Sequence, residues 1–431
     1  MQFFSSLFLF LALTLNLEAK LNIIKKENLD SNTTLLVIGG IHGNEPGGYY
    51  APSILATHYK ILSKNLWIIP NLNEASILKF RRGIHGDMNR KFAHMKQNDK
   101  DKAIVEAIKK IILLPRISLI LNLHDGHGFY REKNQGRIYN TKAWGQTCVI
   151  DQCKLLKKTP YFNLGKIAQE VKDDINQKLL SKHHSFSVKN THTKRDHYKD
   201  MQQSLTYFAI QHYKPAFAIE TSKRLATLSQ KVFYQLVAIE SYMKIMGIQF
   251  KRDFTLNRTS IDKLIKDYGT LKINNNILLN LNDIKKSLSY IPIRLGQNNF
   301  EFSNPLGSIK KLKGNYYIYI ANHLILQLKP QYFIMASDCQ EGYKFEIDGR
   351  AVFVPKASEI FVHDNFKIKK NNQVRVNVIG YSKQGILDES DINISYKDLN
   401  KKYAVDRDGK VFRVEFYKNK KFCSMIMVHF K

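Results

Sequence analysis

The most constraining feature of this 431-residue sequence is the stretch from Thr34 to Glu45. It begins with an uninterrupted apolar run, Leu35 to Ile38, which two glycines close. An apolar run of this length before turn residues is typical of a strand that is covered on both faces in an α/β sheet. His42 and Glu45 follow just past the strand, where open sheets usually place their active sites. The stretch therefore predicts a metal site at the end of a buried strand.

Strand-like and helix-like segments alternate from Lys20 to about Gly247. Strand-like runs lie at 35–38, 66–69, 117–123 and 216–219, and helical spacing of apolar residues covers 104–112, 164–179 and 232–243. This alternation predicts an α/β domain, which we assign to residues 20–249.

The pattern changes after about Lys251 to short β-type runs with little helical periodicity. Runs at 316–320 and 332–335 predict a small all-β domain at residues 250–340. Further runs at 343–347, 352–354 and 374–379 are followed by a hairpin signal at Asp408-Gly409, between Val405 and Val411. These predict a C-terminal β-sandwich of the immunoglobulin-like kind at residues 341–431.

The first 19 residues contain an apolar run, Leu7 to Leu15, and end on the small Ala19. This pattern predicts a signal peptide and export to the periplasm. An uncleaved anchor helix is the alternative, but the run is shorter than the ~20 residues that span a bilayer. No stable membrane span is therefore expected after cleavage.

The chain is strongly basic, with 67 Lys and Arg against 37 Asp and Glu and a formal charge of +30. Such a charge favours polyanionic partners. Nucleic acid is not expected for an exported protein, whereas an anionic cell-wall polymer or membrane surface is. A lysine-rich composition spread over the surface explains the charge equally well, so charge alone is weak evidence of function. The sequence does not indicate an oligomeric state.

Four cysteines remain in an exported chain, where disulfides are permitted. Cys148 and Cys153 are the local pair able to close a small loop. For Cys339 and Cys423, inert buried thiols are an equal alternative. The absence of a Cys-x-x-Cys pattern argues against a thiolate zinc knuckle or a redox motif.

A third candidate ligand strengthens the His-x-x-Glu pattern, which alone is weak in a chain with 14 histidines. His124 ends the apolar strand-like run 119–123. Two histidines and one carboxylate form a three-ligand zinc set that leaves a fourth position for water. His42, Glu45 and His124 are therefore predicted to bind one zinc ion.

Two further segments carry suitable chemistry. In the first, Arg82 precedes an Asp-Met-Asn-Arg run in which Asn89 and Arg90 can hold a carboxylate, although a basic loop is the simpler alternative. In the second, Glu220 ends the apolar run 216–219, where burial would raise its pKa toward the range of a general base. Such a strand-end acid more often caps a helix or forms a salt bridge.

Together these motifs resemble the M14 zinc carboxypeptidases in order and spacing. The resemblance covers Gly39 to Thr221 and implies that Glu220 moves the proton of the attacking water to the leaving amine. It further implies that Arg82, rather than Arg81, polarises the scissile carbonyl. Asn89 and Arg90 would bind the terminal carboxylate of the substrate. The tyrosine that the family places on the substrate side is left open between three candidates, Tyr198, Tyr207 and Tyr213.

The leader and two C-terminal β domains make the chain similar to the periplasmic peptidoglycan DL-carboxypeptidases that determine helical cell shape. These release terminal meso-diaminopimelate from muramyl tripeptide. Some carry glutamine at the first ligand position, where this chain has His42. The rival hypotheses are an N-acyl amino acid deacylase of the aspartoacylase or succinylglutamate desuccinylase type and a non-catalytic cell-wall-binding scaffold. The remaining histidines in the basic segment 183–197 are expected on the surface, and His127 is expected near the pocket.

Overall fold

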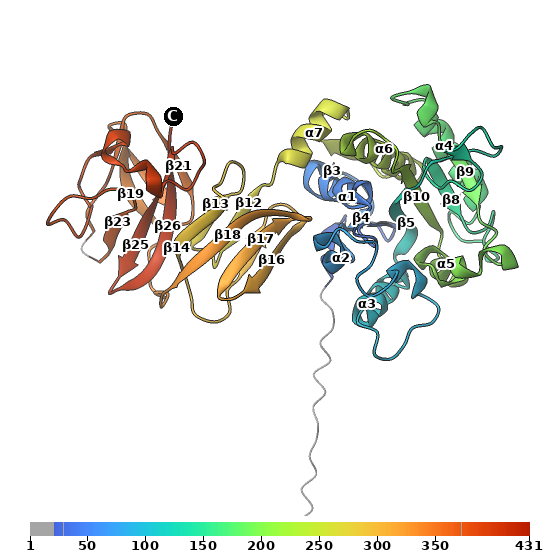
Figure 1. The fold of residues 1–431 in the computed structure, drawn as a ribbon, viewed down its shortest axis with the longest axis horizontal. Coiled ribbons are helices and arrows are strands. Elements are labelled where there is room, and N and C mark those ends of the chain that lie inside the picture. The colour runs from blue at the N-terminus through green and yellow to red at the C-terminus, as the bar shows by residue number, and fades with distance from the viewer. Residues whose placement is uncertain (1–20, 29, 372) are drawn as a thin grey trace, which may run out of the picture.

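The computed structural model describes residues 21–28, 30–371 and 373–431, with the side chains of 196–198 also left out. The predicted signal peptide at 1–19 lies outside the described residues. The molecule is elongated, with an α/β domain at one end, a β-sandwich at the other and a smaller β region between them (Figure 1). This order confirms the predicted fold class.

The α/β domain is built on a seven-stranded mixed sheet in the order β1-β4-β2-β5-β10-β8-β9. The four inner strands β4, β2, β5 and β10 run parallel, whereas β1 and β8 pair antiparallel with their inner neighbours. All five residues of β2 are buried, as expected for a strand covered on both faces. The strands are β1 (Ile24–Lys26), β2 (Thr34–Ile38), β4 (Asn65–Ile69), β5 (Ile117–Gly126), β8 (Thr147–Ile150), β9 (Ser187–Asn190) and β10 (Ala216–Ser222).

Helices cover both faces of this sheet. Figure 1 shows α1 (Pro46–His58), α4 (Leu164–Asn176) and α6 (Leu228–Ile245) on one face. The other face carries α2 (Glu74–Leu78), α3 (Lys102–Ile112) and α5 (Leu205–Gln211). In α3 the buried residues Val105, Ile108 and Ile112 recur at three- and four-residue steps, which is why this segment forms an amphipathic helix. The three predicted helical segments are confirmed.

Residues just past the predicted boundary at 249/250 still lie against the α/β domain. The strand β11 (Phe250–Arg252) pairs with β3 (Tyr59–Ile61), and α7 (Arg258–Lys266) packs on α6. The predicted domain boundaries stay predictions.

The middle region contains a three-stranded sheet, β13-β12-β15, and a four-stranded sheet, β14-β18-β17-β16. The predicted strand at 332–335 is wrong, because β18 ends at Tyr332. Beyond it Phe333 donates to the carbonyl of Ile293, and Ala336 donates to that of Phe422 as the chain crosses toward the sandwich. The strands are β12 (Thr270–Ile273), β13 (Ile277–Asn280), β14 (Ser287–Ile293), β15 (Phe300–Phe302), β16 (Gly307–Leu312), β17 (Asn315–Ile320) and β18 (His323–Tyr332).

The C-terminal region is a sandwich of two four-stranded sheets, β20-β19-β22-β24 and β21-β26-β25-β23. Its core contains the buried rings of Phe345, Phe366, Phe412 and Phe416. The strands are β19 (Gly342–Ile347), β20 (Arg350–Pro355), β21 (Glu359–Val362), β22 (Asn365–Ile368), β23 (Arg375–Val378), β24 (Ile394–Ser395), β25 (Val411–Lys418) and β26 (Lys421–Phe430).

One sequence prediction about this region is wrong, and one alternative that the sequence left open is decided. The Asp408-Gly409 segment does not join two hairpin strands, because β25 pairs instead with β26 through a turn at Asn419-Lys420. Cys339 and Cys423 are not thiols but form a disulfide across a sequence separation of 84 residues. Cys148 and Cys153 are free, since Cys148 is buried in β8 and Cys153 lies exposed after that strand.

Candidate metal and peptidase site

A glycine-rich turn carries the first candidate ligands from β2 to α1. Gly40 adopts a left-handed φ of 71°, which glycine reaches without steric cost. A Cβ on Gly43 would lie 2.0 Å from the carbonyl carbon of Ser76 in α2, so only glycine allows this close approach. The turn thereby places His42 and Glu45 at the carboxyl edge of the sheet.

His124 and Glu220 come from adjacent parallel strands. They are register partners in the pairing of β5 with β10, so their side chains emerge at the same level of the sheet. Both strands are buried along most of their length up to these positions, which fixes the register by burial. The metal candidates and the candidate base therefore meet at one edge.

The three predicted ligands converge and are almost fully buried. The Nδ1 atom of His42 lies 3.0 Å from Oε2 of Glu45, and Nδ1 of His124 lies 2.9 Å from the same oxygen. The two Nδ1 atoms are 3.2 Å apart. Ligands of a tetrahedral zinc ion stand roughly 3.3 Å from one another, so this spacing suits such an ion.

Asp87 completes the surroundings of His42. It is the residue that precedes the short 3₁₀ helix η1 (Met88–Arg90), and its Oδ1 atom lies 2.8 Å from Nε2 of His42. A carboxylate here requires the N–H on Nε2, which leaves a lone pair on Nδ1 facing the cluster. Arg82 binds Oδ2 of Asp87 at 2.9 Å and Oε1 of Glu45 at 3.0 Å.

Charge pairing sets the direction of the pKa shifts of His42, Glu45 and Asp87, whereas burial lowers the pKa of His124. Burial alone would lower the pKa of His42, but Glu45 and Asp87 outweigh it and raise that pKa. Burial would likewise raise the pKa of Glu45, yet His42 and His124 hold it well below the ordinary value. The same balance, through His42 and Arg82, lowers the pKa of Asp87. Both carboxylates are thus anionic at neutral pH, as metal-site carboxylates must be.

Glu220 behaves differently from these acids. Burial, with the neighbouring Glu45 carboxylate, raises the pKa of Glu220 well above its ordinary value. A cation held by the cluster would offset the charge of Glu45 and bring this pKa back toward neutrality. The side chain is placed to exchange a proton inside the pocket.

Asn89 and Arg90 reach the pocket from η1. The Oδ1 atom of Asn89 accepts a hydrogen bond from the backbone N–H of Leu205 at 3.0 Å. The side-chain NH2 group of Asn89 therefore points away from Leu205. The Arg90 side chain donates to the carbonyl of Asn89 at 2.9 Å. Both side chains keep donors available for an anionic group.

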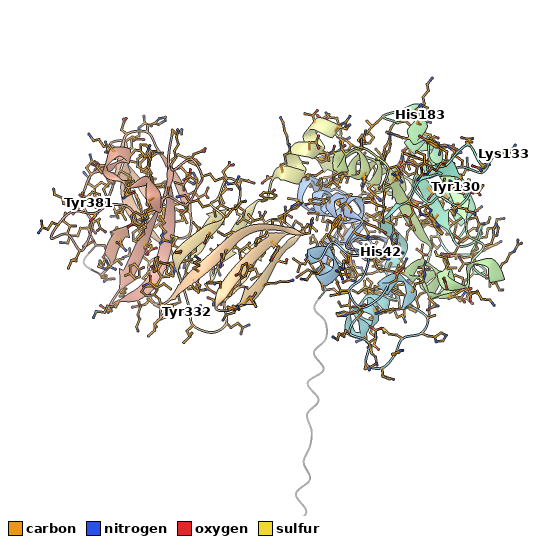
Figure 2. All side chains as sticks on the ribbon, in the orientation of Figure 1. His42, Tyr130, Lys133, His183, Tyr332 and Tyr381 are labelled. Atoms are coloured by element: carbon orange, nitrogen blue, oxygen red, sulfur yellow. A yellow bond between two sulfur atoms is a disulfide. The ribbon has the colours of Figure 1, made fainter. Side chains whose placement is uncertain are left out.

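These residues line one cavity of about 220 Å³. Every predicted site residue borders it, and Figure 2 shows His42 inside the α/β domain. Arg81 is not among the lining residues. No tyrosine whose side chain the structure describes lines the cavity either, and the side chain of Tyr198 is not described. The substrate-side tyrosine therefore stays unplaced. The lining residues are His42, Glu45, Arg82, Asn89, Arg90, His124, Asp125, Gly126, His127, Trp144, Met201, Glu220 and Lys223.

Sequence reasoning missed several of these. Lys223 follows the strand of Glu220 closely, and its Nζ atom lies 3.3 Å from Oε1 of Glu45; that position was the available signal. Trp144 comes from a loop and Met201 from the 3₁₀ helix η3 (Asp196–Gln203), and neither gave a sequence signal. Asp125 adjoins His124, and its carboxylate accepts the N–H of Gly47 at the start of α1 at 2.9 Å.

The histidines of segment 183–197 do not form a second cluster among the described residues, where one group of potential metal ligands occurs. His183 and His192 are exposed, as expected. His184 is half-buried, with Nδ1 2.9 Å from the Tyr234 hydroxyl. The side chain of His197 is outside the description.

Comparison with known families decides the class of this chain. A family model described as the catalytic domain of a carboxypeptidase controlling helical cell shape matches residues 3–266. The chain belongs to this family. Residues 336–431 match a second model, described as the C-terminal domain of metallo-carboxypeptidase. The chain is thus a metallocarboxypeptidase, and the family and the buried cluster together indicate a metal. The predicted recognition is confirmed.

Solved structures agree over 95% or more of this chain. The apo form of cell shape determinant protein Csd4 from Helicobacter pylori is 34% identical, with a TM-score of 0.86, and the match covers 96% of this chain and 100% of that one. A structure titled as the mDAP-bound form of Csd4, a D,L-carboxypeptidase, has the same identity and TM-score, and the match covers 95% of this chain and 100% of that one. A tripeptide-bound Csd4 structure is 34% identical with a TM-score of 0.86, and the match covers 96% of this chain and 100% of that one. No curated protein sequence matches this chain.

Proposed function

We propose that this chain is a periplasmic, zinc-dependent DL-carboxypeptidase. It would trim the muramyl tripeptide of peptidoglycan to a dipeptide by releasing terminal meso-diaminopimelate, and so influence cell shape. The observation that carries this proposal is the buried cluster of His42, Glu45 and His124, with Glu220 on the neighbouring strand at the same level. The diaminopimelate- and tripeptide-bound structures of the Helicobacter pylori relative support the substrate class.

The ligand set favours zinc. Two imidazoles and one carboxylate are a common catalytic zinc set, whereas Mg²⁺ and Ca²⁺ prefer oxygen ligands. When bound, such an ion supplies Lewis acidity and makes water a nucleophile near neutral pH. The Asp87 carboxylate would keep the His42 ring in the tautomer that presents Nδ1.

The side chains of the pocket divide the remaining work. Glu220 takes a proton from the attacking water and returns it to the leaving amine. Arg82, whose side chain is 45% exposed, donates to the oxygen of the scissile carbonyl, which becomes more negative during attack. Asn89 and Arg90 bind the free carboxylate at the end of the peptide and place the last peptide bond beside Glu220.

The surroundings suit a wall peptide. The formal charge of +30 would draw an anionic polymer toward the protein. Within the described residues, no helix has the length and hydropathy needed to cross a membrane. A leader at 1–19 that is removed after export would leave the enzyme in the periplasm, with peptidoglycan peptides as its partners.

Incubation with defined muropeptides tests the proposal. Purified protein should release diaminopimelate from muramyl tripeptide, lose this activity with a chelator and regain it with added zinc. Tripeptide whose terminal carboxylate is amidated is the matched control and should be a poor substrate. Release of an acid from N-acyl amino acids in place of peptide cleavage would support the deacylase instead. Binding to wall without any hydrolysis would support a scaffold.

A further inference from the structure

Lys189 is a buried lysine near the pocket. It lies in β9, the edge strand that pairs with β8, yet the residue is only 3% exposed. Its Nζ atom donates to the carbonyls of Thr141 and Ala143 at 3.0 and 3.1 Å. Among the described residues no carboxylate lies within ion-pair distance of its ammonium, and Glu220 is the acid whose charge acts on it. A buried charge whose direct partners are neutral groups is costly, which points to a role beyond stability.

Two aromatic rings complete the surroundings of this ammonium. The Nζ atom lies 4.2 Å from the centroid of the Tyr130 ring and 4.8 Å from that of the Trp144 ring. Both distances are those of cation–π contacts. Figure 2 places Tyr130 in the α/β domain, as it does His42. Lys189 therefore ties a loop and two rings together behind the pocket.

The same loop is pressed against the strand that carries His124. The backbone N–H of Trp144 donates to the carbonyl of His127 at 2.9 Å. A Cβ on Gly126 would lie 2.7 Å from the carbonyl carbon of Trp144, so the loop backbone touches the end of β5. Trp144 borders the cavity together with His124 and Glu220. The backbone of Trp144 is thus fixed on one side and its ring is held by Lys189.

We propose that Lys189 is a positioning residue that holds the segment 141–144, and through it the Trp144 indole, in the wall of the peptidase pocket. The proposal rests on the proposed function, because the wall matters only if peptide binds there. An apolar side chain of similar length would fill the space but could not bind the two carbonyls. Burial lowers the pKa of Lys189 to about 8, so at neutral pH the ammonium is the main form.

Tryptophan fluorescence tests the positioning directly. The chain has two tryptophans, Trp67 and Trp144, so Trp67→Phe leaves Trp144 as the sole reporter. In this background Lys189→Met should increase acrylamide quenching and shift the emission, because the released indole becomes more exposed. Lys109→Met is the matched control, since Lys109 lies 4.9 Å over the Phe208 ring, away from the pocket. It should leave Trp144 emission unchanged.

Kinetics on muramyl tripeptide provide the second readout. Lys189→Met should raise KM about 10-fold with little change in kcat, as expected for lost substrate positioning. Lys189→Arg, which keeps the charge and donors, should recover part of the loss. In a Trp144→Ala background, Lys189→Met should change KM less than about 2-fold, because the lysine acts through the indole.

Unchanged quenching and KM in Lys189→Met would overturn the proposal. So would a full additional loss in the Trp144→Ala background. If Lys189→Met does not fold, Lys189→Gln, which removes the charge but keeps an N–H donor, carries the same comparison. Should the wild-type chain cleave no muropeptide, the proposed function fails, while the quenching comparison still decides whether Lys189 positions the indole.

Discussion

Two buried glutamates, one in each end domain, show the difference between a structural and a functional charge. Glu415 in the sandwich is 3% exposed, as is Glu45 in the pocket. Glu415 pairs with Arg413 at 3.2 Å and accepts from the Tyr417 hydroxyl at 2.6 Å. One carboxylate oxygen therefore has a hydrogen bond within the chain, and the other has the Arg413 charge beside it without a hydrogen bond. The Arg413 side chain also donates to the carbonyl of Ser289 in β14, so this pair joins the sandwich to the middle region.

Glu45 has cationic partners on one oxygen only, since Arg82 and Lys223 lie 3.0 and 3.3 Å from its Oε1 atom. Its Oε2 atom meets two imidazole nitrogens, and the nitrogen that His42 presents there carries a lone pair. Lone pairs and an anion that converge in a buried space repel one another unless a proton or a metal ion lies among them. The sandwich thus uses buried charge to fix a domain contact, whereas the α/β domain gathers ligand atoms of the kind that a metal ion binds.

The largest expected effect is on catalysis, and it distinguishes Glu220 in the pocket from Glu415 in the sandwich. Glu220→Gln should retain metal but lower turnover of muramyl tripeptide by about 100- to 10,000-fold, the usual contribution of a general base. Metal content by mass spectrometry and product release by chromatography measure both. The control is Glu415→Gln, which should keep wild-type turnover. Normal turnover in Glu220→Gln would remove this residue as the base.

Breaking the sandwich pair should affect stability and leave chemistry intact. Arg413→Met leaves Glu415 buried without its partner and should lower the free energy of unfolding by about 3 kcal/mol. Denaturant unfolding followed by circular dichroism measures this loss, and turnover per folded molecule should not change. Adding Glu415→Gln should restore most of the stability. A loss of turnover in folded Arg413→Met protein would contradict the division of roles.

Asp87 tests whether the pocket cluster is a metal site. Asp87→Asn removes the carboxylate that orients His42 and should weaken zinc affinity about 10- to 100-fold. Competition with a chromogenic chelator measures the affinity. Asp99→Asn is the control, because Asp99 is bound by Lys91 outside the pocket. It should leave the zinc affinity unchanged. Equal affinity in Asp87→Asn would show that His42 needs no such partner.

Arg90 tests the carboxylate contact. Arg90→Ala should raise KM for muramyl tripeptide about 10-fold, because a charge-assisted hydrogen bond to the terminal carboxylate is lost. The exposed neighbour Arg81, replaced by alanine, should behave as wild type. If Arg90→Ala raises the KM for an amidated tripeptide by the same factor, the residue does not recognise the carboxylate.

The ligands and the base were predictable from sequence because they follow apolar runs. The apolar runs from Leu35 to Ile38 and before His124 predict buried strands, and parallel strands bring their carboxyl ends together. Lys189 and Trp144 gave no signal, because one lies on a short edge strand without alternation and the other in a loop. Their burial is decided by tertiary contacts. The Cys339–Cys423 pairing was also hidden, because spacing along the chain does not determine which cysteines meet.

The smallest effect concerns the hairpin that the sequence placed wrongly. Asn419 and Lys420 both have positive φ, 49° and 64°, which is the conformation of the two-residue turn between β25 and β26. Asparagine tolerates this conformation, whereas a lysine there is strained. Lys420→Gly should therefore stabilise the sandwich by about 0.5 kcal/mol, the gain being reduced by the greater freedom of glycine in the unfolded chain. The midpoint of denaturant unfolding measures this shift, and turnover in the distant pocket should stay constant. A destabilised variant would mean that the Lys420 side chain contributes more to the folded sandwich than its backbone strain costs. The sequence signal at Asp408-Gly409 misled because the turn that joins the two strands contains a lysine where a glycine is expected.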